Sequence, residues 1–152
     1  MDNILSIVTM LTAIVSIVVA VITYIRDTKR KAQQDTFEAY QRLQNDVLSK
    51  INRLTPGEVR EFSTRSRSEE YKQMTEYLMT IECFCIGLEK GIYDFEVFYS
   101  LTQGYFNNKK RGSIRPTIEP MIEEKTKRFG RNFYPNLESI WNMMDQRDRD
   151  GA

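Results

Sequence analysis

The chain of 152 residues contains no histidine. Histidine is the usual general base near neutral pH and the commonest metal ligand, so its absence removes most nucleophilic triads and many metal sites. The sequence also has neither GxxxxGK[ST] nor GxGxxG, the glycine-rich loops that cradle phosphates. We therefore predict that the protein is not an enzyme and that it holds no cofactor and no metal ion.

Cysteine is scarce as well, because Cys83 and Cys85 are the only two. Positions two apart on a helix point to different faces, so the two thiols can neither chelate one ion nor form a disulfide with each other. We interpret both as small, buried apolar residues.

The chain also lacks an excess of either charge, since it has 22 basic and 21 acidic residues. This balance argues against a nucleic-acid partner held by bulk positive charge. A small basic loop at Lys109, Lys110 and Arg111 and scattered arginines at 60–67 would give only local phosphate contacts.

Residues 4–25 form a long apolar run without a charged side chain. About 20 helical residues cross a hydrocarbon core of roughly 30 Å. The run follows Asp2 rather than a basic segment and has no small-residue cleavage site, which argues against a secretion signal. We predict an uncleaved transmembrane helix over residues 1–25.

A basic collar follows this helix, formed by Arg26, Lys29, Arg30 and Lys31. Basic flanks stay on the cytosolic side of a membrane, and Tyr24 stands where an interfacial aromatic belt is expected. We therefore predict a protein of the plasma (inner) membrane, with the N-terminus outside, the C-terminal domain in the cytosol and membrane lipid as a partner.

Small and hydroxyl-bearing residues recur along the same helix at spacings of three and four. This seam consists of Ser6, Thr9, Ala13, Ser16, Ala20 and Thr23. Membrane helices associate through such faces, because these residues allow close backbone approach, so we expect a homo-oligomer. Turned toward the axis of a ring, the seam would instead line a narrow polar pore, and both interpretations stay open.

No proline or glycine occurs before Pro56, and apolar residues recur at helical intervals between positions 37 and 54. We predict a helical stalk over residues 26–55 that ends at Thr55-Pro56-Gly57. A small helical bundle over residues 56–147 and a polar tail over residues 148–152 complete the predicted all-α fold.

Caps and apolar periodicity place the helices of this bundle. Ser68 begins one that ends before Gly91, and Asp94 caps a shorter one. A third ends at Gly130, so Pro120 must lie in its first turn or break it. The last starts near Pro135, and the residues from position 145 on are too polar to pack.

Residues 131–136, with the sequence RNFYPN, resemble a damaged ribonuclease motif. HEPN families carry Arg-Asn-x-x-x-His, in which the histidine acts on an RNA phosphate. Here Arg131 and Asn132 are present, but Asn136 takes the histidine position, and an amide exchanges no proton near neutral pH. A helix cap with a packed arginine is the alternative interpretation of these residues.

A single membrane helix, a helical domain and this motif together resemble the membrane accessory proteins of type VI-B CRISPR systems. Residues 76–82, 91–94 and 132–141 are also similar to a broader bacterial family of membrane-anchored domains without assigned function. The first resemblance implies a divergent HEPN-like bundle and a ring of subunits around a membrane pore. It gives Arg131 and Asn136 structural or interfacial roles.

The predicted function is that of a self-associating single-pass membrane protein that perturbs or gates the membrane. The resemblance implies that it serves antiphage defence as an accessory to an RNA-guided nuclease. The alternative is a membrane-tethered helical binding module or scaffold without a pore, whose partner is a cytosolic protein.

Overall fold

The computed structural model describes residues 2–102, 104–107 and 113–150, without the side chains of residues 2–9 and 11. Every regular element in these residues is helical. The predicted all-α class is therefore confirmed.

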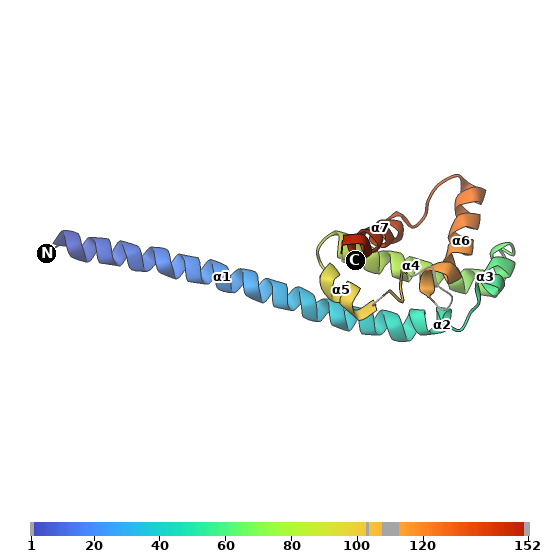
Figure 1. Ribbon diagram of the computed structural model, residues 1–152, viewed down its shortest axis with the longest axis horizontal. Helices are drawn as coiled ribbons and strands as arrows, with labels where there is room; N and C mark the ends of the chain where they lie inside the picture. The colour runs from blue at the N-terminus through green and yellow to red at the C-terminus, as the bar shows by residue number, and fades with distance from the viewer. Residues whose placement is uncertain (1, 103, 108–112, 151–152) are drawn as a thin grey trace.

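Helix α1 (Asp2–Leu43) is a long rod that projects from the rest of the molecule (Figure 1). All of its described side chains up to Lys31 are exposed. The segment predicted to cross the membrane, residues 4–25, is helical throughout. Over the described part of the chain, however, no helix has both the length and the apolar character of a membrane span.

The rod continues beyond α1 through a π-helical turn, η1 (Gln44–Leu48), and α2 (Ser49–Ile51). The predicted stalk is thus helical for most of its length, but it stands free only in its first few residues. Its later residues belong to the core of the domain: Thr36, Leu43, Val47, Leu48 and Ile51 are buried.

Thr36 joins the rod to the domain. Its hydroxyl donates to the carbonyl oxygen of Ala32 and accepts from the backbone N–H of Asp94, both at 2.6 Å. Asp94 in turn caps α5 (Phe95–Thr102), as predicted, because its Oδ1 accepts from the N–H of Val97 at 3.1 Å. The start of α5 is therefore fixed beside the point where α1 enters the domain.

The triplet Thr55-Pro56-Gly57 ends the rod and also begins α3 (Pro56–Ser63), a helix that the apolar pattern did not reveal. Thr55 and Glu58 form a capping box: the Thr55 hydroxyl accepts from the Glu58 N–H at 3.3 Å, and the Glu58 carboxylate accepts from the Thr55 N–H at 2.7 Å. Proline suits the first helical position because an N–H there would have no acceptor within the helix, so its absence costs no hydrogen bond.

Helix α4 (Glu69–Glu89) follows the prediction closely. The Ser68 hydroxyl accepts from the N–H of Tyr71 at 3.1 Å, and the chain leaves the helix through Gly91 at φ 68°. The predicted inward face is buried along its whole length: Tyr71, Met74, Leu78, Ile81, Cys85 and Leu88.

Helix α6 (Ile114–Phe129) corrects the prediction for Pro120, which lies inside the helix without breaking it. Its missing N–H removes one hydrogen bond, to the carbonyl four residues earlier, and the flanking turns continue. The helix ends at Gly130, at φ 66°, where the left-handed conformation favours glycine.

Helix α7 (Pro135–Asp150) starts at the predicted proline, and its predicted face, Leu137, Ile140, Trp141 and Met144, is buried. The polar tail, predicted not to pack, is instead helical to Asp150. Asp145 pairs with Arg115 of α6 at 3.1 Å, and Asp148 accepts a hydrogen bond from Tyr99 of α5. Polar residues pack here because neighbouring helices supply their partners.

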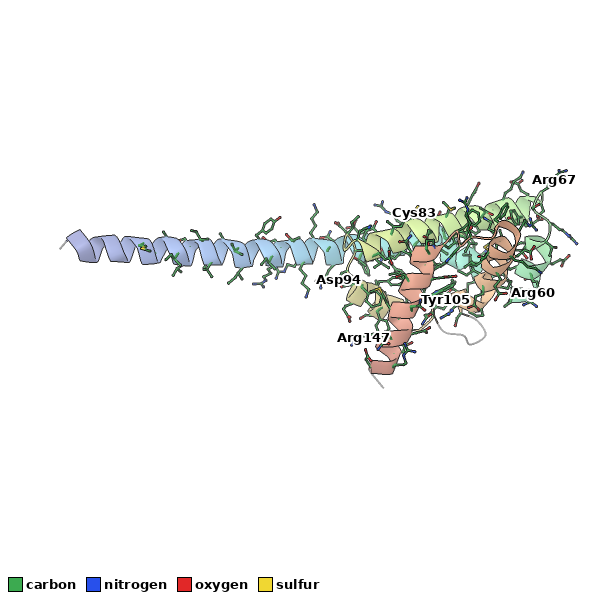
Figure 2. All side chains as sticks on the ribbon, turned by 90° about the horizontal axis from the view of Figure 1, so that it is seen from above. Arg60, Arg67, Cys83, Asp94, Tyr105 and Arg147 are labelled. Atoms are coloured by element: carbon green, nitrogen blue, oxygen red, sulfur yellow. The ribbon has the colours of Figure 1, made fainter. Side chains whose placement is uncertain are left out.

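The domain is organised around α4. Helix α7 packs on α4, and α3 packs on α6 at the end of the domain far from the N-terminus (Figure 1). Figure 2 shows α7 running away from the axis of α1, with α5 between α7 and the rod.

We expect Gly87→Ala to destabilise the domain by about 1–3 kcal/mol, because overpacking strains a filled core. A Cβ at Gly87 would lie 2.4 Å from the ring of Tyr93, which stacks on Phe84 at 5.0 Å between centroids. Urea unfolding of the purified protein, followed by circular dichroism, measures this loss. Gly57→Ala, where a Cβ meets nothing closer than 3.9 Å, is the control and should not destabilise.

Candidate functional site

The first candidate surface is residues 10–25 of α1, part of the predicted membrane anchor and hereafter the anchor segment. Its described large aliphatic side chains and Met10 are 46–66% exposed in the single chain: Met10, Ile14, Val15, Ile17, Val18, Val19, Val21, Ile22 and Ile25. Water-soluble monomers rarely expose an apolar surface of this extent, which is typical of protein or membrane contact sites.

The seam lies within this segment. Ala13, Ser16, Ala20 and Thr23 are exposed, and the Ser16 hydroxyl donates to the carbonyl oxygen of Thr12 at 2.8 Å. The side chains of Ser6 and Thr9 are outside the described residues.

The seam also has a definite position relative to the domain. A turn of about 100° per residue places Ala20 and Thr23 on the side of α1 roughly opposite Thr36, which contacts the domain. The domain therefore covers none of the described seam residues, Ala13, Ser16, Ala20 and Thr23.

The basic collar, which the sequence predicts to lie at a membrane interface, follows directly. Tyr24 is 73% exposed, and Arg26, Lys29, Arg30 and Lys31 are exposed beside it. Among the described residues, no ion pair includes these basic side chains. Their charges are thus free to meet a surface outside the chain.

The second candidate site is the turn between α6 and α7, which carries the motif of residues 131–136. Asn132 closes this turn: its Oδ1 accepts from the N–H of Tyr134 at 2.8 Å, and its Nδ2 donates to Glu138 at 2.7 Å. Arg131 is exposed, and its guanidinium lies over the ring of Phe133, 4.6 Å from the centroid.

Asn136 is bound by Glu82 of α4, a residue that the sequence analysis did not single out. Glu82 Oε1 accepts from the backbone N–H and the side-chain amide of Asn136, at 3.0 and 2.6 Å. Its Oε2 accepts from the N–H of Leu137 at 2.8 Å. A buried carboxylate at the positive end of a helix is favourable, so these contacts fix the start of α7 on α4.

Lys125 of α6 is a second buried ionisable residue at this turn. Its Nζ donates to the Tyr134 hydroxyl at 2.8 Å and lies 5.4–5.7 Å from the ring centroids of Tyr71, Phe133 and Tyr134. Burial lowers the pKa of Lys125 and raises the pKa of Tyr134. The aromatic faces and the one hydroxyl offset part of the cost of burying this cation.

The helical spacing contained a signal for both residues. Glu82 follows Leu78 by four positions and precedes Cys85 by three, so it lies on the buried face of α4. Lys125 follows Ile122 by three positions on α6. A charged residue on an apolar face thus indicated a buried polar contact.

The two cysteines differ from the prediction that both are buried. Cys85 is buried, and burial raises the pKa of its thiol, whereas Cys83 is exposed. The reason is that α4 turns only one side toward the core. The basic loop at Lys109, Lys110 and Arg111 lies outside the described residues.

These features define an all-α protein with a projecting N-terminal helix in which residues 10–25 carry no charge. In the parts of the chain that the structure describes, no group of three or more histidine, cysteine, aspartate or glutamate side chains is placed to hold a metal ion.

The chain belongs to the family described as "Domain of unknown function (DUF4760)", whose model matches residues 10–143. No curated protein and no solved structure matches it. The resemblance to CRISPR accessory proteins therefore stays a prediction.

We expect Glu82→Gln to destabilise the domain by about 2 kcal/mol, because the new amide group opposes an N–H donor of α7 and the charge at the helix start is lost. Thermal unfolding followed by circular dichroism measures the change. Glu76→Gln, on the exposed side of the same helix, is the matched control and should unfold like the unsubstituted protein. Equal unfolding of both variants would contradict the assigned role of Glu82.

Proposed function

We propose that the protein is a single-pass membrane protein in which α1 anchors the helical domain and associates with other copies of α1. The observation that carries this proposal is the exposed apolar surface of the anchor segment, which no other part of the described chain covers. Burial of such side chains in lipid or against other helices is strongly favourable.

The length of the segment is compatible with this role. The uncharged residues 12–25 would cover roughly 20 Å of a hydrocarbon core that is about 30 Å thick. The predicted span begins earlier, at Ile4, and α1 is already helical there. Residues 4–25 together supply the required length.

The collar supports an orientation. Exposed basic side chains stand on the domain side of the anchor segment and are attracted to anionic lipids at the cytosolic surface. The domain would accordingly lie in the cytosol of the cell, with the N-terminus outside.

The exposed seam favours association between α1 helices in lipid. Its small residues allow close packing, and the domain leaves this face free. A ring of such helices with the seam inward would form a pore, the second candidate function. A role beside an RNA-guided nuclease in antiphage defence rests on the family resemblance.

A residual ribonuclease, the activity suggested by the likeness of residues 131–136 to the HEPN motif, is a weaker interpretation. The contacts of Asn132 and Asn136 occupy their amide groups at the start of α7. RNA cleavage that is lost on Arg131→Ala would revive this interpretation.

We expect Val15→Lys with Val18→Lys to move the protein out of the membrane fraction. Two lysines near the centre of a span disfavour insertion by about 5 kcal/mol or more in total. Resistance to alkaline carbonate extraction measures membrane insertion. The control, Val15→Leu with Val18→Leu, should stay in the membrane. Extraction of the unsubstituted protein by carbonate would refute the proposal that α1 anchors the protein in the membrane.

We expect Ser16→Leu with Thr23→Leu to weaken self-association in mild detergent roughly tenfold, because bulky side chains block close helix packing. Analytical ultracentrifugation measures the change, and Val15→Leu with Val18→Leu is again the control because both positions lie off the seam. A protein that is monomeric before substitution would overturn the proposed association.

Dye leakage from liposomes separates a pore from the alternative function, a membrane-tethered helical binding module without a pore. A pore should release dye, and release should fall in the seam variant. A tethered module should release no dye. It should also still bind its cytosolic protein partner when an unrelated monomeric anchor replaces residues 4–25.

A further inference from the structure

A groove of about 730 Å³ lies on the surface of the domain beside α7. Phe95 at the start of α5 and Met143 of α7 give it an apolar part, and Met143 is 40% exposed. Glu96, Glu138, Arg147 and Asp150 are its charged residues.

The groove carries more negative than positive charge. Its one basic side chain, Arg147, already pairs with Glu96 at 3.2 Å. Glu138 accepts from Asn132 and Asp150 accepts from Gln146, which are neutral amides. Within the described chain, neither carboxylate has a cationic partner, so the groove suits an occupant with basic and apolar parts.

The collar on α1 has the complementary character. Arg26, Lys29, Arg30 and Lys31 are exposed along one short stretch, accompanied by the single acidic residue Asp27. Directly before them come the apolar residues of the anchor segment. No ion pair of the described residues joins the collar to the groove within one chain.

The groove and the collar also lie at neighbouring levels along α1. The Asp94 N–H bonds to Thr36 at 2.6 Å, which places the adjoining Phe95 beside this part of the rod. Lys31 precedes Thr36 by roughly 8 Å along the helix axis. Figure 2 shows Asp94 and Arg147 on the side of the domain from which α1 emerges.

We propose that the groove beside α7 binds the basic collar of a second copy of this chain. The inference rests on the proposed function, because parallel α1 helices in one membrane bring the collar of one copy close to the level of its neighbour's groove. The contact is heterologous, groove to collar, so each copy can use both surfaces and the assembly can close into a ring.

Cross-linking tests the juxtaposition directly. Two differently tagged full-length chains, one with Met143→Cys and one with Lys29→Cys, are reconstituted together in lipid, both carrying Cys83→Ser. A short bifunctional maleimide should join the two tags. Glu61→Cys in place of Met143→Cys is the control, since Glu61 is exposed on α3 away from the groove, and it should give no product.

Charge reversal tests the energetics. Glu138→Lys with Asp150→Lys should weaken self-association at least roughly tenfold, because like charges then face each other. Adding Lys29→Glu with Arg30→Glu to the same chain should restore it, which a merely misfolded groove variant would not do. Reversal of two exposed carboxylates elsewhere, Glu61→Lys with Glu69→Lys, should have no effect.

The outcomes separate this inference from the proposed function. If the unsubstituted protein forms oligomers but neither the cross-link nor the charge-reversal effect appears, the groove contact is wrong and membrane association stands. If the collar substitutions abolish binding to anionic vesicles while leaving oligomers intact, the collar serves lipid and the contact is also wrong. A carbonate-extractable monomer would instead defeat the proposed function itself.

Discussion

The domain depends on the carboxylate of Glu82, buried on α4 and bound to the first N–H groups of α7. The start of a helix leaves N–H groups without partners, and burying them would be costly. By accepting these hydrogen bonds, Glu82 fixes where α7 begins and in which direction it runs. Arg115 can then pair with Asp145 of α7, and Tyr99 can donate to Asp148 of α7. Arg147 of α7 pairs with Glu96 of α5.

The contact between Glu82 and Asn136 also explains the role of the motif at residues 131–136. A histidine in the place of Asn136 would need a free ring nitrogen to move a proton. Asn136 instead donates from its backbone N–H and its side-chain amide to Glu82, and Asn132 holds the turn before it. The chemistry available at this turn is therefore that of a helix start, in which amides donate and a carboxylate accepts.

Helix α1, unlike the start of α7, has contact partners within the chain for only part of its length. From Thr36 onward α1 contacts the domain, through the hydrogen bond between Thr36 and Asp94 and the burial of Leu43. The turns that continue it, η1 and α2, bury Val47 and Ile51. Before Lys31 nothing in the described chain covers it. One continuous helix thus combines a part that completes the core of the domain with a part whose apolar side chains have no partner in the single chain. Our proposals of anchoring and self-association address that second part.

The sequence by itself determined the helical class, the inward face of α4, the caps at Ser68 and Asp94 and the ends at Gly91 and Gly130. These features depend on residues a few positions apart, so spacing and cap chemistry are enough to find them. It did not reveal α3, whose eight residues are too short for a clear apolar period. Only the tertiary structure decided the partners of Glu82 and Lys125, the packing of the polar end of α7 and the groove beside it. Those depend on side chains that lie far apart in the sequence, such as Glu82 and Asn136, and their meeting is set by how whole helices pack.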